Sequence, residues 1–132
     1  MALGIGIDMV SIAEIARIAG EMDPKHPERL DAFVRRAFTP AEVELALARH
    51  NPAEFLAGRF AVKEAAFKAL APRTAEGFDF RIIETLTAPS GAPVITIDAP
   101  KLQPVLAEAG VTELLVSITN EDDYAVAVVL AQ

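Results

Sequence analysis

The spacing of apolar and polar positions changes along the chain, from helical periods in the first half to strand-like runs in the second. Residues 3–8 form a short apolar run that contains Gly4 and Gly6, which predicts a buried strand. The two glycines indicate that another backbone or a ligand approaches this strand closely. After it, Ser11 and Glu14 have the spacing of a capping box, and apolar residues then recur at helical period. We therefore expect a strand followed almost at once by a helix.

Helix signals continue as far as residue 72. A short helix is expected between Arg29 and Ala37. The segment Thr39-Pro40-Ala41-Glu42 combines a capping box with proline at the first helical position, and Asn51-Pro52-Ala53-Glu54 repeats that start signal. The second start opens a long central helix, which we expect to end near Ala71-Pro72.

The last third of the chain is rich in strand-forming residues separated by turn signals. We expect two strands around a Pro-Ser-Gly turn, one helix, and a final hairpin whose turn is Asn-Glu-Asp-Asp. The ranges are 81–87 and 93–98 for the first strands, 100–110 for the helix, and 113–119 and 124–131 for the hairpin. Together with the first half, this order predicts an α+β fold: an N-terminal strand, several helices including a long central one, then mostly antiparallel strands. Residues 1–132 are expected to form a single domain.

Composition excludes several classes of protein. With 132 residues that are 52% hydrophobic, the chain is large enough to bury a core, and it has no cysteine for disulfides or thiolate chemistry. A net charge of -7 argues against general nucleic-acid binding. The first ten residues have no basic flank and meet Asp8 early, and no segment approaches the roughly 20 apolar residues that span a bilayer. We expect a soluble, cytoplasmic protein without a signal peptide or membrane contact.

The inventory of reactive side chains narrows the chemistry further. The three serines lie outside any Gly-x-Ser-x-Gly setting, and His26 and His50 have no evident partner, so a Ser-His hydrolase is not expected. The chain also lacks the histidine spacings of zinc sites.

Charge within the long central helix is the most informative remaining feature. Glu64 and Lys68 share one helix face and could form a simple i,i+4 ion pair, while Asp8 could be only a turn or capping residue. Alternatively, Asp8 and Glu64 could supply two hard oxygen ligands to Mg²⁺, with Lys68 close to the same substrate phosphates. The spacing alone leaves both interpretations open.

Taken together, the motifs resemble those of the holo-acyl-carrier-protein synthase type of 4′-phosphopantetheinyl transferase. They run in order along nearly the whole chain: Gly4-Ile5-Gly6-Ile7-Asp8, Arg36-Ala37-Phe38-Thr39 with Glu42, Phe55-Leu56-Ala57-Gly58-Arg59-Phe60-Ala61-Val62-Lys63-Glu64-Ala65 with Lys68-Ala69, and Tyr124-Ala125-Val126-Ala127. The central run is specific to this family, whereas the glycine-rich start alone is a weak signal. A short, trimeric type is implied, and Ser11-Ile12 after the aspartate resembles its actinobacterial branch.

The resemblance implies a function and a set of site residues. Asp8 and Glu64 would hold Mg²⁺, Arg59 and Lys68 would lie close to coenzyme A, and active sites would form between the subunits of a homotrimer. The chain would transfer 4′-phosphopantetheine from coenzyme A to a serine of an apo acyl carrier protein or carrier domain, releasing 3′,5′-ADP in support of fatty acid synthesis. Asp8, Glu64 and Lys68 are the expected catalytic residues; the general base is left open.

Two positions depart from the family pattern. Asn120 stands where relatives usually have a histidine near the coenzyme, so the chain has an uncharged amide at that expected coenzyme-binding position. Glu14 stands where many relatives have an arginine, and Arg17 is the candidate to dock the carrier instead. The alternatives are a non-catalytic coenzyme A or carrier-protein binding paralogue, and a structural α+β subunit in which Glu64 and Lys68 only pair with each other.

Overall fold

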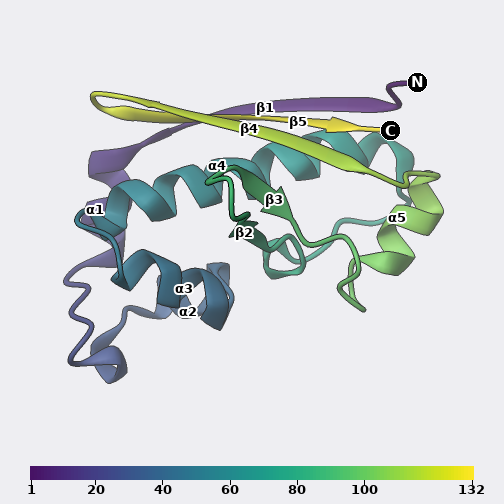
Figure 1. Cartoon of the computed structure of the whole chain (residues 1–132). Coiled ribbons are helices and arrows are strands. Elements are labelled where there is room, and N and C mark those ends of the chain that lie inside the picture. The colour runs from purple at the N-terminus through teal and green to yellow at the C-terminus, as the bar shows by residue number, and fades with distance from the viewer.

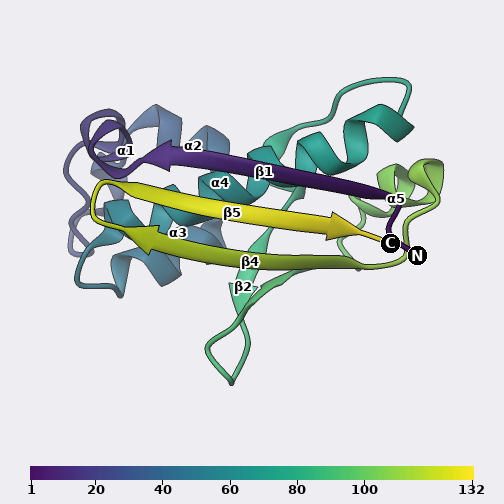
Figure 2. The ribbon, with the colours of Figure 1, turned by 90° about the horizontal axis from the view of Figure 1, so that it is seen from above.

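A three-stranded antiparallel sheet joins the two ends of the chain. The computed structural model describes residues 1–132, apart from the side chain of Phe80. The sheet order is β1 (Gly4–Ser11), β5 (Tyr124–Ala131) and β4 (Leu114–Glu121), and Asp8 lies opposite Ala127. Figure 2 shows the three strands side by side, with the N- and C-termini at the same end. The first and last segments of the sequence therefore share one layer.

The long helix α4 (Pro52–Leu70) packs against one face of this sheet, as Figure 1 shows. The two glycines of β1 make the close packing geometrically feasible. A Cβ atom at Gly4 would lie 2.1 Å from the carbonyl oxygen of Ala69, and one at Gly6 would lie 1.8 Å from that of Ala65. Any side chain there would collide with the helix backbone. The expected close approach to this strand is thus confirmed, and the approaching backbone is that of α4.

Three short helices lie between β1 and α4. They are α1 (Ile12–Ala19), α2 (Ala32–Ala37) and α3 (Pro40–Leu47), with a 3-10 turn η1 (Pro27–Arg29) before α2. The side chains of Ser11, Thr39 and Asn51 accept hydrogen bonds from the backbone three residues later, at the starts of α1, α3 and α4. All three predicted capping positions are confirmed. The expected helix at 29–37 is shorter: Arg29 belongs to η1, and Asp31 is the N-cap of α2.

The segment after α4 differs most from the sequence expectation. It contains the 3-10 turns η2 (Ala71–Arg73) and η3 (Phe80–Ile82), the short pair β2 (Thr85–Thr87) and β3 (Pro93–Ile95), and α5 (Gln103–Ala109). The strand predicted over 81–87 is wrong in its first half, where η3 stands. The final hairpin is confirmed, but β4 extends through Asn120 and Glu121, so Asp122 and Asp123 alone form the turn.

Two apolar clusters form the core. One lies between α4, the sheet and α5, and the other packs α1, α2 and α3 against the start of α4, with the rings of Phe33, Phe38 and Phe60 in contact. The outer face of the sheet has no covering layer in Figures 1 and 2. The helices and antiparallel strands confirm the predicted α+β class. None of the helices in the described part of the chain has the length and apolarity to cross a membrane.

Candidate active site

Asp8 and Lys68 meet where β1 crosses the C-terminal half of α4. Even-numbered positions of β1 face the helix, and Asp8 is one of them, half-buried within the strand. The Lys68 Nζ lies 3.2 Å from Asp8 Oδ1 and donates to the Ile7 carbonyl oxygen at 3.0 Å. Asp8 is therefore neither a turn residue nor a helix cap, since the cap of α1 is Ser11.

Glu64 belongs to the same group of charges. It lies one turn before Lys68 on α4, and partial burial raises the pKa of its carboxyl above the ordinary value. The negative charge of Asp8 raises that pKa further, whereas Lys68 lowers it. Among the described residues no ion pair joins Glu64 to Lys68, because the lysine turns to Asp8. The i,i+4 pair considered from the sequence is not formed, and the two carboxylates influence each other directly.

Two carboxylates with one ammonium between strand and helix suit a small divalent cation. Oxygen is the donor that Mg²⁺ prefers, and this ion is commonly held by one or two carboxylates with water and phosphate oxygens completing the shell. The mutual repulsion of Asp8 and Glu64 is only partly offset by Lys68. Within the described residues there is no cluster of three or more His, Cys, Asp or Glu side chains that could hold a metal ion. The donor set fits Mg²⁺.

Arg59 lies on the other side of α4. Nine residues separate it from Lys68, which at 100° per residue places the two side chains on opposite faces. Its Nε donates to the Thr85 carbonyl at 3.3 Å, its Nη2 donates to Thr87 Oγ1 at 2.9 Å, and its guanidinium stacks 4.2 Å from the Phe55 ring centroid. Burial lowers the pKa of Arg59 below the ordinary value. No carboxylate forms an ion pair with it in the described part of the chain.

Asn120 is also separate from the carboxylates. It lies near the end of β4, the strand farthest from β1, and its Nδ2 donates to Glu54 Oε1 at 3.4 Å. A cavity of about 1080 Å³ between α2, α3 and residues 79–101 has none of Asp8, Glu64 or Lys68 in its lining. One chain therefore brings Asp8, Glu64 and Lys68 together, but leaves Arg59 and Asn120 apart from them.

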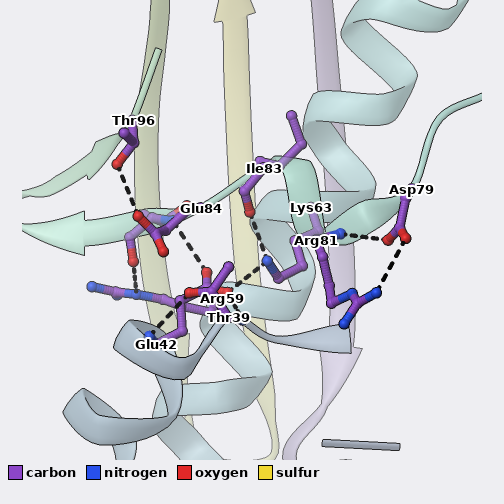
Figure 3. Close-up of polar contacts among 10 residues, drawn as sticks. Thr39, Glu42, Arg59, Lys63, Asp79, Arg81, Ile83, Glu84 and Thr96 are labelled. Carbon is purple, nitrogen blue, oxygen red and sulfur yellow. Dashed lines mark hydrogen bonds and ion pairs between the residues drawn. The ribbon is translucent and has the colours of Figure 1, made fainter. Parts of the chain in front are cut away.

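A second set of charges was present in the family motifs but was not among the predicted site residues. Glu42 and Lys63 are fully buried, and Lys63 Nζ lies 2.7 Å from Glu42 Oε1 (Figure 3). Burial lowers the pKa of Lys63, and the charge of Glu42 opposes this shift. The capping box predicted for Glu42 is present. The neighbouring sequence, however, does not distinguish a capping glutamate that is buried from one that is exposed. The available signal was a lysine that follows the apolar pair Ala61 and Val62 in a helix rich in alanine.

A family profile and several relatives match nearly the whole chain. The sequence profile of the 4′-phosphopantetheinyl transferase superfamily matches residues 4–129. Over 132 residues the chain is 36% identical to a holo-[acyl-carrier-protein] synthase of Shewanella piezotolerans and 42% identical to one of Maridesulfovibrio salexigens. In both cases the match covers 100% of this chain and 99% of the relative.

Solved structures of similar proteins have the same fold. A holo-[acyl-carrier-protein] synthase from Neisseria meningitidis aligns with a TM-score of 0.80 at 32% identity, covering 100% of this chain and 99% of that one. One from Helicobacter pylori, solved in complex with coenzyme A, aligns with a TM-score of 0.73 at 30% identity, covering 97% and 99%. The chain therefore belongs to the 4′-phosphopantetheinyl transferase superfamily, and within it to the holo-[acyl-carrier-protein] synthases.

Proposed function

We propose that this chain transfers the 4′-phosphopantetheine group of coenzyme A to a serine of an apo acyl carrier protein or carrier domain, using Asp8, Glu64 and Lys68. The observation that carries the proposal is the meeting of these three side chains from β1 and α4. We place the reaction in the cytoplasm and in the service of fatty acid synthesis. Retention of both carboxylates and the lysine argues against a non-catalytic binding paralogue, which has less need of a metal pair.

The roles follow from charge and position. Asp8 and Glu64 would hold Mg²⁺, which when bound supplies positive charge to the pyrophosphate of coenzyme A. The ammonium of Lys68, about half exposed beside Asp8, is placed to offset charge on the same phosphates. The carrier serine oxygen attacks the β-phosphorus, the bond to the bridging oxygen breaks, and 3′,5′-ADP leaves with that electron pair. The serine proton passes to a general base.

A homotrimer completes this proposal. The outer sheet face exposes large apolar side chains at Ile5, Ile7 and Met9, which are 68%, 61% and 63% exposed, and the half-buried Val126, Val128 and Leu130 lie beside them. Such a continuous apolar strip is typical of a subunit interface. Ile7 and Met9 point to the opposite sheet face from Asp8, but β1 is an edge strand of this sheet, so a second copy that packs over this face and around the edge could reach the carboxylates. It could then supply the Arg59 and Asn120 that one chain keeps apart from them.

Light scattering at micromolar concentration tests the assembly. The expected mass is about three times the 14.1 kDa of one chain. A monomer mass would contradict both the trimer and the shared site. The narrower actinobacterial-like grouping rests on Ser11-Ile12, and Ser11 has the structural role of capping α1.

Intact-mass spectrometry tests the reaction itself. An apo acyl carrier protein incubated with this chain, coenzyme A and Mg²⁺ should gain about 340 Da, the mass of phosphopantetheine as a serine modification. Omitting coenzyme A, or replacing the carrier serine by alanine, should leave the carrier mass unchanged. No gain with an intact, folded chain would refute the proposed function.

A further inference from the structure

Arg59 is a buried cation that is placed to pair with an anionic group of a ligand. Its side chain is only 8% exposed, and no carboxylate of the described residues pairs with it. A guanidinium has five N–H donors, and the Thr85 carbonyl and Thr87 hydroxyl account for two of them. The stack on Phe55 fixes the plane of the group. The remaining donors are thus held in one orientation, as an anionic group of a ligand requires.

The backbone of Thr85 is one of the contacts that orient Arg59. The Thr96 amide donates to the Glu84 carbonyl at 2.8 Å, which is the regular ladder bond between the neighbouring positions of β2 and β3. Successive residues of an antiparallel strand point their backbone N–H and C=O groups in alternate directions. Thr85 follows Glu84, so its N–H and C=O groups point away from β3. Its carbonyl accepts from Arg59, and its amide donates to Glu42 Oε2 at 3.1 Å. The side chains of Glu42 and Arg59 therefore bind the Thr85 amide and carbonyl, which would pair with a further strand in a larger sheet.

Glu42 is held in turn by the N-cap of its own helix, α3, and by Lys63 of α4. Its Oε1 accepts from the Thr39 amide at 2.9 Å and lies 2.7 Å from Lys63 Nζ, and Lys63 also donates to the Ile83 carbonyl at 2.6 Å. Figure 3 shows these side chains converging between α3, α4 and the strand that leads into β2. A capping box needs only one carboxylate oxygen. The second oxygen of Glu42 is used on Thr85, and the burial of the whole group makes that bond rigid.

We propose that Glu42 is a positioning residue for coenzyme A binding: it fixes Thr85, and Thr85 fixes the guanidinium of Arg59 toward an anionic group of the coenzyme. This inference rests on the proposed function, in which Arg59 contacts coenzyme A. Lys63 keeps the charge of Glu42 compensated, so that the carboxylate can be buried. The buried pair thus has a role in substrate affinity in addition to its role in packing.

Glu42→Asp is the sharpest test, because it keeps the negative charge beside Lys63 but shortens the side chain by about 1.5 Å. The flexible lysine can follow the shorter carboxylate, whereas the Thr85 amide cannot. Titration calorimetry with coenzyme A and the full chain should show binding about three- to tenfold weaker, and Arg59→Met should weaken it about ten- to a hundredfold. The Michaelis constant for coenzyme A should rise while that for the carrier stays unchanged.

Thr39→Ala is the matched control. It removes the other bond of the same capping box, from the Glu42 amide to Thr39 Oγ1 at 3.2 Å, and leaves the contact between Glu42 and Thr85 in place. It should lower the melting temperature by a few degrees without changing coenzyme A affinity. Glu42→Gln serves as a second variant, because an amide oriented with its oxygen toward Lys63 presents a donor to the Thr85 N–H. It should weaken coenzyme A binding as Glu42→Asp does.

The double variant Glu42→Asp with Arg59→Met tests whether Glu42 affects coenzyme A binding through Arg59. If Glu42 acts through Arg59, the double variant binds coenzyme A no more weakly than Arg59→Met alone. Additive losses, wild-type affinity in both Glu42 variants, or an equal loss in Thr39→Ala would each overturn the inference. Wild-type affinity in Arg59→Met would overturn it as well. Failure of the wild-type chain to modify any apo carrier would instead refute the proposed function, and the binding cycle would still report the coupling.

Discussion

Adjacent residues of α4 lie in opposite electrostatic environments. Lys63 is fully buried, and Glu42 and the Ile83 carbonyl accept its hydrogen bonds within the protein. Glu64, the next residue, turns toward β1, where the repulsion from Asp8 is only partly offset by Lys68. Charges of the first kind hold α3, α4 and β2 together. Charges of the second kind remain available to a cation and a phosphate.

This difference explains why a central helix of the core carries so many ionisable residues. The apolar residues Ala61, Val62 and Ala66 of α4 are fully buried, and Lys63 and Glu64 lie in the two different kinds of environment. Removing one member of a buried, hydrogen-bonded ion pair lowers the stability of the fold. Replacing a half-exposed, incompletely paired group lowers mainly the activity. Substitutions on the same helix should therefore separate folding from transfer.

Lys63→Met should produce the largest effect. It leaves the carboxylate of Glu42 buried without its cation, which should lower the free energy of unfolding by about 3–5 kcal/mol. Lys68→Met on the same helix is the matched control: its side chain is 52% exposed, and the loss of stability should stay below about 1 kcal/mol. Urea unfolding at one fixed protein concentration measures both. Equal losses would contradict the distinction between the two environments.

Asp8→Asn and Glu64→Gln should show the opposite pattern. Each keeps the size of the side chain but removes a negative oxygen, so transfer should fall by roughly a hundredfold or more while the melting temperature stays near that of the wild type. Raising Mg²⁺ should restore part of the rate in a weakened site. The exposed Asp98 offers a matched control, since Asp98→Asn should change neither quantity. A near-wild-type rate, or a loss that follows unfolding, would refute the metal pair.

Much of the fold was predictable from local signals. Capping residues such as Ser11 and Thr39 act on the backbone three residues away, so the sequence itself contains both partners of the interaction. The strand predicted over 81–87 failed in its first half because Asp79 forms a turn there, accepting from the amides of Arg81 and Ile82, and the contacts of the following residues are with distant segments. The Ile83 carbonyl binds Lys63, and Thr85 binds Glu42. Hydrophobic spacing carries no information about such tertiary bonds.

The candidate site was predictable to a similar degree. Gly4 and Gly6 indicated a close backbone, which is the contact that brings Asp8 to α4. That Lys68 would turn to Asp8 and not to Glu64 depends on packing that the helical spacing does not contain. Glu42 was predicted as part of a capping box and of a family motif, and the capping box accounts for only one of its carboxylate oxygens. Its second oxygen, used on Thr85, became visible only once α3 and β2 were placed together.

The smallest expected effect concerns α1, whose charges are fully at the surface. Arg17, our candidate for docking an acidic carrier, is paired with Glu14 one turn earlier. Glu14→Gln should free the guanidinium and remove a repelling charge, lowering the Michaelis constant for the carrier by about two- to threefold. Arg17→Glu should raise it, and neither change should alter the constant for coenzyme A. Both differences should fade at high salt, because exposed charges are screened. Equal effects on the two substrates would show that Arg17 serves the fold or the nucleotide and not the carrier.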